Sequence, residues 1–281
     1  MNKDCIQELE IDLIDACNLS CPLCNRNVLK SKDGYIPLDE WISIFDQYKY
    51  LKAIFLIGTR SEHTLYPEFL NLMRYFKSRG LSIIISTNGC TNKLNFWSEL
   101  KDILQVEDEV RFAVDGITQD IYEQYRVGGN LEKLMNNHKA FKSEKDNDIM
   151  QYIRFEHNQH EDITEFLQQF SGLRTTNSSF EGNHDGSIVK QTPQDSKRYN
   201  LVTKIIRNRK PNISCETKGK MHFINHRGQT SPCCYYNEDV VLQGGEWDGT
   251  YEDIEAAKFD FCTIMCDKFC TNLLKSLDIE L

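Results

Sequence analysis

Short apolar runs alternate with longer amphipathic patterns over roughly the first 170 residues of the chain. This alternation is typical of βα units that surround a parallel sheet or barrel. Five β-rich segments are the expected strands, at residues 8–13, 53–57, 82–86, 109–114 and 150–156. The clearest helical patterns lie at residues 38–49, 67–78, 131–143 and 161–169.

Three of these strands carry charged residues at every second position. The charged residues are Glu8, Glu10 and Asp12 in the first strand, Arg111 and Asp115 at the fourth, and Arg154 and Glu156 in the fifth. A parallel strand buried on both faces would be almost entirely apolar. We therefore expect the apolar face to pack on helices and the charged face to line a polar lumen, with Arg154 and Glu156 as candidate catalytic residues there.

A closed eight-stranded barrel fills its lumen with branched apolar side chains, which does not suit charged strand faces. The pattern thus predicts an α/β fold with a partial, open barrel of about six βα units. An open doubly wound sheet is the alternative. We expect this barrel core to span residues 1–171.

The character of the chain changes after residue 171. Residues 172–210 form an expected linker that is polar and irregular at first and then strongly basic at residues 197–210. That basic segment is either a solvated helix face or a contact for an anionic group on the substrate. Residues 211–281 hold six of the eleven cysteines and too few apolar residues for a large core, which predicts a small appendage held together by metal.

Composition excludes several classes of protein. No signal pattern or membrane-length apolar run is visible, so we expect a cytoplasmic protein with no membrane partner. The net charge of −9 disfavours a nucleic-acid partner, since proteins that bind nucleic acids need a basic surface. Eleven cysteines in the reducing cytoplasm indicate metal or redox use rather than disulfides, although Cys5 and Cys90 are isolated and expected to serve packing only.

Three cysteines, Cys17, Cys21 and Cys24, follow the first strand in one short loop. Barrel active sites are built at this end of the strands. A structural zinc site needs four ligands, and no histidine precedes His63. A cubane iron–sulfur cluster on three cysteines instead keeps one iron open for another ligand.

The CxxxCxxC loop after the first strand resembles the signature of the radical S-adenosylmethionine (SAM) superfamily. The resemblance implies a [4Fe–4S] cluster on Cys17, Cys21 and Cys24, whose open iron is chelated by SAM. Reductive cleavage of SAM would then give methionine and a 5′-deoxyadenosyl radical that abstracts a substrate hydrogen. Such an enzyme needs a reductant such as flavodoxin or ferredoxin. A zinc-stabilised binding module and an iron–sulfur electron carrier remain the alternatives.

Further segments extend this resemblance and imply cofactor contacts. Glu62 stands where the family binds the methionine ammonium, although the usual Gly-Glu-Pro reads Ser61-Glu62-His63 here. Thr87-Asn88-Gly89 resembles the family's turn after the third strand. Phe112 to Gly116 resembles its fourth-strand motif, in which Asp115 is retained and Ala113 replaces a frequent serine. Leu23 stands where an apolar residue packs on the adenine.

A second cysteine group begins at Cys215 and resembles the SPASM and twitch appendages of radical SAM enzymes. In these, a hairpin, here expected at residues 221–228, and later cysteines hold an auxiliary [4Fe–4S] cluster. The preferred ligands are Cys215, Cys233, Cys266 and Cys270, with Cys234 and Cys262 as alternates. A four-cysteine zinc site at the same positions stays open.

The substrate class is less clearly indicated. The segment before the first strand is too short for a peptide-leader-binding domain, which favours a small sugar, cyclitol or nucleotide-linked substrate. A peptide-modifying SPASM-type maturase is the alternative. Whether the substrate radical ends in oxidation, rearrangement or coupling is open.

Overall fold

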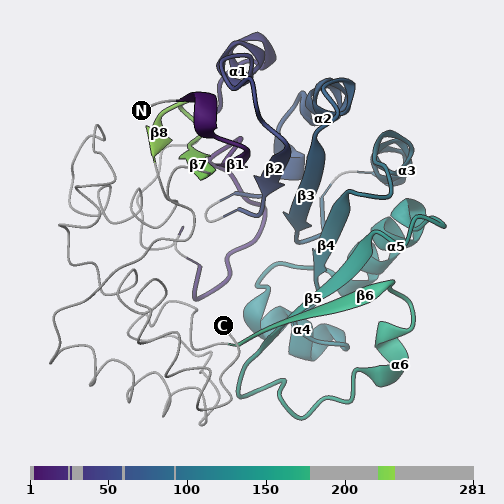
Figure 1. The fold of residues 1–281 in the computed structure, drawn as a ribbon. Helices are drawn as coiled ribbons and strands as arrows, with labels where there is room; N and C mark the ends of the chain where they lie inside the picture. Colours follow the sequence, from purple (N-terminus) through teal and green to yellow (C-terminus); the bar gives the residue numbers. More distant parts are fainter. Residues whose placement is uncertain are drawn as a thin grey trace, which may run out of the picture.

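The computed structural model describes residues 3–24, 26, 34–58, 61–91, 93–177 and 221–231. Within them, one sheet has the strand order β6-β5-β4-β3-β2-β1-β7-β8 (Figure 1). Neighbouring strands are parallel except β7 and β8, which form an antiparallel hairpin. The strands are β1 (Glu8–Ile11), β2 (Ala53–Leu56), β3 (Ser82–Thr87), β4 (Glu109–Ala113), β5 (Asp148–Arg154), β6 (Gly172–Asn177), β7 (Met221–Ile224) and β8 (Thr230–Ser231).

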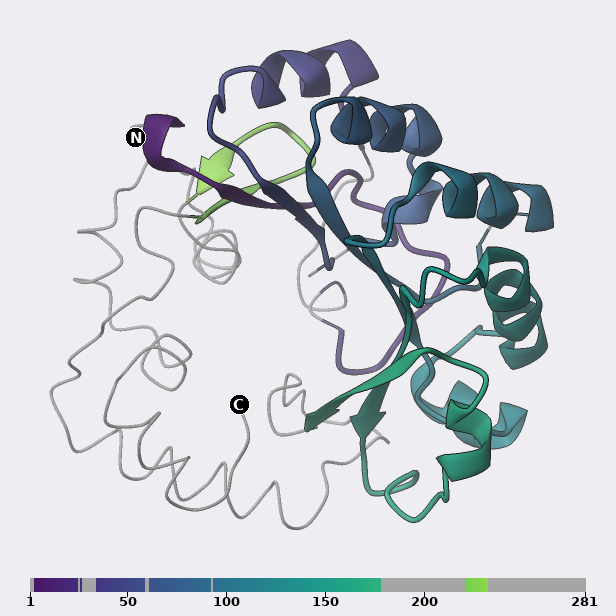
Figure 2. The same cartoon turned by 45° about the vertical axis from the view of Figure 1, so that its right-hand side comes forward.

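Four helices lie along one face of this curved sheet, as Figures 1 and 2 show for α1, α2, α3 and α5. The helices are α1 (Leu38–Phe45), α2 (Phe69–Ser78), α3 (Leu94–Ile103), α4 (Gln119–Tyr125), α5 (Leu131–Phe141) and α6 (Thr164–Leu167), with short 3-10 turns η1 (Lys3–Cys5) and η3 (His63–Leu65). The first six strands and their helices confirm the expected partial barrel. We call the helix-covered face outer and the opposite face inner.

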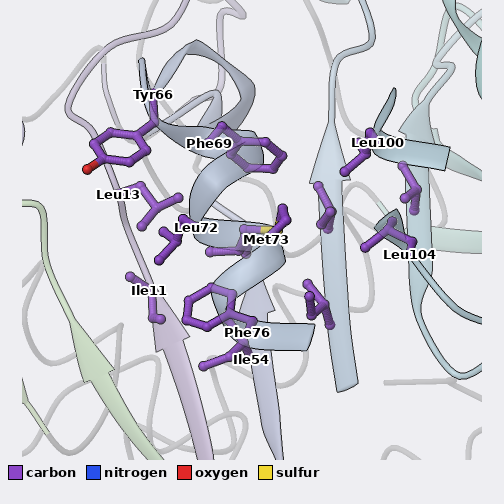
Figure 3. Packing of buried hydrophobic residues seen from close by; sticks show 14 of the residues in the cluster. Ile11, Leu13, Ile54, Tyr66, Phe69, Leu72, Met73, Phe76, Leu100 and Leu104 are labelled. Carbon is purple, nitrogen blue, oxygen red and sulfur yellow. The ribbon is translucent and has the colours of Figure 1, made fainter. Parts of the chain in front are cut away.

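The main core fills the space between the helices and the outer face. Figure 3 shows α2 placing Phe69, Leu72, Met73 and Phe76 against residues from the strands, among them Ile54 of β2. Each of these five side chains is at most 1% exposed. Burial of such a side chain contributes roughly 1.5–3 kcal/mol of transfer free energy. This packing fixes the relative positions of the strands and of the loops that follow their carboxyl ends.

Side-chain caps mark the beginnings of α4, which was not among the expected elements, and of α5, which was expected at residues 131–143. The Thr118 hydroxyl accepts a hydrogen bond from the Ile121 amide at 3.4 Å and begins α4. Asn130 caps α5 in the same way, through the Lys133 amide at 2.7 Å. Gly116 is needed just before α4, because a Cβ there would lie 2.4 Å from the Tyr122 backbone nitrogen. The helix α3 was also absent from the expected elements.

The sheet extends beyond the expected core boundary at residue 171. Residues 172–177 were expected in an irregular linker but form β6, which pairs with β5 along its whole length. Because these residues are mostly polar, the hydrophobic pattern of the sequence does not reveal the strand. Backbone pairing with β5 stabilises it. The expected hairpin is present as β7 and β8, yet β7 pairs with β1 and so belongs to the barrel sheet rather than to a separate appendage. The other limits of the linker and appendage lie outside the described residues.

The inner face is polar at β1 but not at the end of β5. Glu10 and Asp12 are buried, at 7% and 3% exposure, opposite the outer-face residues Leu9 and Ile11. In β5, Tyr152 packs in the outer core, whereas Ile153 packs with the cysteine loop in a second cluster. The strand is therefore apolar on both faces at this point.

Strand parity contradicts the expected placement of Arg154 in the lumen, whereas Glu156 lies past the end of β5 and its expected role stays a prediction. Both side chains are exposed, and Arg154 has the strand parity of Tyr152, on the outer face. Burial raises the pKa of Tyr152, and the charge of Arg154 acts in the opposite direction. This agrees with a position of Arg154 on the same side of the strand as Tyr152. The alternation separated two faces correctly, but the apolar residue Ile153 faces the cysteine loop rather than the helices.

Candidate functional site

The loop after β1 brings three thiols together. Cys21 is buried, and Cys17 and Cys24 are half-buried. The Cys24 amide donates to the Cys21 carbonyl at 3.1 Å, and the Leu19 amide donates to the Cys17 sulfur at 3.4 Å. Both bonds curl the backbone so that successive cysteines share one side of the loop.

The electrostatics of the thiols suit an iron–sulfur cluster. Burial raises the pKa of Cys17 to about 11 and that of Cys24 to about 12, and it also raises the pKa of Cys21. Charge on Cys21 contributes to the raised pKa of both other thiols, so the three groups are mutual neighbours. Thiols of this kind become thiolates when a metal centre is bound, since metal binding displaces their protons. The donor set therefore fits a cluster carried by three cysteines.

A buried carboxylate lies beside this loop. Glu62 is 2% exposed and belongs to the segment between β2 and η3. Its amide donates to the Ala16 carbonyl at 2.9 Å, which joins it to the cysteine loop. Its charge raises the pKa of Cys17. Glu62 was expected here from the sequence, although Thr59 and Arg60 of the same motif lie outside the described residues.

Four hydrogen bonds fix the Glu62 carboxylate. Oε1 accepts from the Thr87 hydroxyl at 2.7 Å and from both the hydroxyl and the amide of Thr64, at 2.6 and 3.4 Å. Oε2 accepts from the Asn88 amide at 2.7 Å. Burial raises the pKa of Glu62 even though these bonds act in the opposite direction. No cation pairs with it among the residues that the structure describes.

Thr87 and Asn88 link Glu62 to the cysteines. The Asn88 side-chain amide donates to Asn18 Oδ1 at 2.9 Å and points at the Cys17 sulfur at 3.8 Å. The turn continues through Gly89, whose φ of 67° favours glycine. The structure thus brings together four of the expected residues, Cys17, Glu62, Thr87 and Asn88.

Asp115 has a different environment from the one expected. It is fully buried, and both carboxylate oxygens bind protein groups: Oδ1 accepts from the Ile153 amide and Oδ2 from Arg126 Nε, each at 2.6 Å. The sequence analysis placed Asp115 in contact with the cofactor. Its observed partners instead make it a brace between the β4 and β5 ends and Arg126.

Leu23 lies in the second apolar cluster and is 3% exposed. This inner cluster consists of Leu19, Cys21, Leu23, Tyr125, Ile153 and Phe155, with Cys17 and Cys24 packed against it. It surrounds the cysteine loop with apolar groups and so lowers the local dielectric. The sequence reasoning missed Tyr125, Ile153, Phe155 and Arg126, because they come from segments distant in the chain.

Other expected sites fall outside the described part of the chain, including Cys215, Cys233, Cys234, Cys262, Cys266 and Cys270. Cys90 is buried as expected, whereas Cys5 is exposed and does not serve core packing. Within the described ranges, no three His, Cys, Asp or Glu side chains are arranged as ligands of a single metal ion. None of the described helices has the length and apolarity needed to cross a bilayer.

The chain is similar to known proteins both in sequence and in fold. A cofactor-modifying protein for tungsten-containing aldehyde ferredoxin oxidoreductase from Pyrococcus furiosus is 30% identical over 110 residues, which is 38% of this chain and 30% of that protein. The curated relatives are thus matched over about a third of their length.

Two solved structures show the same fold at low identity. The structure of anSMEcpe with bound AdoMet and the Kp18Cys peptide has a TM-score of 0.60, 15% identity, and coverage of 98% of this chain and 84% of that one. BtrN in complex with AdoMet and 2-DOIA has a TM-score of 0.50, 13% identity, and coverage of 94% and 88%.

The model of the radical SAM superfamily matches residues 11–167, which is more than half of the chain and includes the whole cysteine loop. The three grouped thiols and the neighbouring buried carboxylate agree with that match. The chain belongs to the radical SAM superfamily.

Proposed function

We propose that this enzyme cleaves SAM reductively on a cluster held by Cys17, Cys21 and Cys24, and abstracts hydrogen from a polar small molecule with an anionic group. The observation that carries the first part is the buried position of Glu62 beside Cys17, where none of the described residues supplies a cation. A buried carboxylate is costly unless it gains an opposite charge. The ammonium of SAM supplies that charge, and the four bound donors hold the carboxylate ready for it.

A [4Fe–4S] cluster held by the three cysteines, together with bound SAM, would supply the radical chemistry. The chain's own residues bind and orient. Glu62 and Asn88 fix one side of the site, and the inner apolar cluster, which includes Leu23, excludes water from the other. The expected reductant is a flavodoxin or ferredoxin. An auxiliary [4Fe–4S] cluster on Cys215, Cys233, Cys266 and Cys270 remains part of this proposal.

The inner face of the sheet supports an anionic substrate. Arg111 of β4 lies beside Ser86 of β3, and Arg174 of β6 lies beside Gln151 of β5. All four residues share the inner face, since the outer-face neighbours Phe112 and Met150 belong to the helix-covered core. The two guanidinium groups are close enough that Arg111, together with desolvation, lowers the pKa of Arg174.

One carboxylate partly neutralises this pair. Arg111 forms an ion pair with Glu109. The charge of Glu109 also favours the protonated form of Arg174, against the effects of desolvation and of Arg111. Among the described residues at β4 and β6, two cations against one anion leave an excess positive charge on this part of the inner face, whereas Glu10 and Asp12 lie on its β1 part. A phosphate or carboxylate on the substrate would neutralise it and form charge-assisted hydrogen bonds. This favours a phosphorylated or carboxylated sugar, cyclitol or nucleotide-linked compound, while a peptide with an acidic side chain is the second candidate.

Deuterium transfer tests the function directly. The anaerobically reconstituted, reduced enzyme is incubated with SAM and C-deuterated sugars or cyclitols, each with and without a phosphate or carboxylate. We expect 5′-deoxyadenosine that carries deuterium from an anionic substrate. Unlabelled 5′-deoxyadenosine with every small molecule, but labelled product with acidic peptides, would instead indicate a peptide maturase.

Arg174 and Arg154 provide a matched pair of substitutions on neighbouring strands. Arg174→Met should reduce kcat/KM for the substrate by about 10- to 100-fold, because a hydrogen bond to a charged group contributes about 1.5–3 kcal/mol. Arg154→Met should change it less than about threefold, since Arg154 lies on the outer face. Uncoupled SAM cleavage measures the intact cofactor site in both. A large loss with Arg154→Met alone would restore that residue to the substrate site.

A further inference from the structure

The guanidinium of Arg126 contacts one of the three thiols. Arg126 immediately follows α4, and its side chain is 14% exposed. Nη1 donates toward the Cys21 sulfur at 3.7 Å, within the range of a hydrogen bond to sulfur. The guanidinium carbon lies 5.0 Å from the centre of the Tyr125 ring. A permanent positive charge thus lies against Cys21 within the inner apolar cluster.

Two further contacts determine the position of this charge. Asp115 binds Arg126 Nε at 2.6 Å and is itself fixed by the Ile153 amide at 2.6 Å. The residue after Arg126 holds the cysteine loop, because the Val127 carbonyl accepts from the Ser20 amide at 3.0 Å. The guanidinium and the loop therefore keep a defined separation, which is a property of preorganised electrostatic groups.

We propose that Arg126 is a positioning residue that acts through the Cys21 sulfur to make the cluster easier to reduce. The inference rests on the proposed role of Cys21 as a cluster ligand. Reduction adds negative charge to a cluster and its thiolates, so an N–H donor with a positive charge stabilises the reduced form more than the oxidised form. Hydrogen bonds to sulfur and nearby charge are known determinants of cluster potentials. The low-dielectric surroundings increase the effect.

Asp115 has the opposite influence in this arrangement. It orients Arg126, but its negative charge partly cancels the guanidinium charge that the sulfur experiences. Arg126 and Asp115 thus shift the reduction potential of the cluster in opposite directions, and one substitution can remove each of these two contributions.

The test measures the midpoint potential by anaerobic titration with electron paramagnetic resonance detection in Arg126→Met, Arg126→Lys and Asp115→Asn. The signal that changes when SAM is added identifies the radical SAM cluster and separates it from an auxiliary cluster. We expect Arg126→Met to lower the potential by about 59 mV, a tenfold change in the one-electron equilibrium. Arg126→Lys should lie between this variant and the wild type.

Asp115→Asn should move the potential in the positive direction, because the amide oxygen can still accept from Arg126 Nε and so keep it in place, while the negative charge that offsets Arg126 is removed. Iron content, measured for each variant, should match the wild type. Unchanged potentials, shifts of the same sign in both variants, or loss of iron in both Arg126 variants would show that Arg126 only braces the loop. A wild-type protein with no SAM-responsive signal would overturn the proposed function instead.

Discussion

Reductive cleavage of SAM should be abolished when Cys17, Cys21 and Cys24 are all replaced by alanine. These thiols lie together after β1, and each affects the charge state of its neighbours. Among the other described cysteines, Cys90 is hydrogen-bonded to Tyr122 and Asn130 in the outer core and Cys5 is exposed, so we expect neither to replace them. The measurement is 5′-deoxyadenosine formed by the reconstituted, reduced protein, and we expect a fall to the rate without enzyme.

Iron analysis of the same protein tests the proposed second cluster. The wild type should bind about eight iron atoms per chain, two cubanes, and the triple variant about four. Cys5→Ala is the matched control, since this exposed thiol lies at the other end of the first strand. A wild-type content near four iron atoms with one zinc would place zinc on the C-terminal cysteines. Cleavage that persists in the triple variant would exclude the assigned ligands.

Glu62→Gln should weaken SAM binding by about 10- to 100-fold while the cluster is retained. The amide keeps the shape of the carboxylate but loses its charge, and a charged hydrogen bond contributes about 1.5–3 kcal/mol. The change also disturbs one of the bonds from Thr64, Thr87 or Asn88, because the amide nitrogen cannot accept. Equilibrium binding of SAM to the reconstituted protein, with iron content measured in parallel, checks this result.

The pH dependence of SAM binding provides an independent check on Glu62. Burial raises its pKa in the free enzyme, and only the ionised form attracts an ammonium. Affinity should therefore fall as the pH drops through that raised pKa, and Glu62→Gln should remove this dependence. Glu68→Gln, a change at an exposed carboxylate of the same segment, is the control. An affinity that responds equally to both substitutions would remove Glu62 from the SAM site.

Several features of this protein follow from the sequence alone. The positions of β1 to β5 and the helices α1, α2 and α5 were predictable, because hydrophobic periodicity reports which residues leave water. The cysteine spacing predicted the cluster loop, and the resemblance to family motifs that follow the strands predicted roles for Glu62, Thr87 and Asn88. These signals are local: each one depends on residues within a few positions of one another.

Only the tertiary structure decided which residues of each strand pack on the helices and which face the cysteine loop. Strand alternation separates two faces but does not say which face packs on what. Here the apolar Ile153 faces the cysteine loop and Arg154 the opposite side, because residues distant in the sequence pack on each face. The same holds for β6 and β7, whose polar or short segments are stabilised by backbone pairing with β5 and β1. Contacts between residues far apart in sequence carry no local pattern, so the bond from Arg126 to Cys21 was visible only in the folded chain.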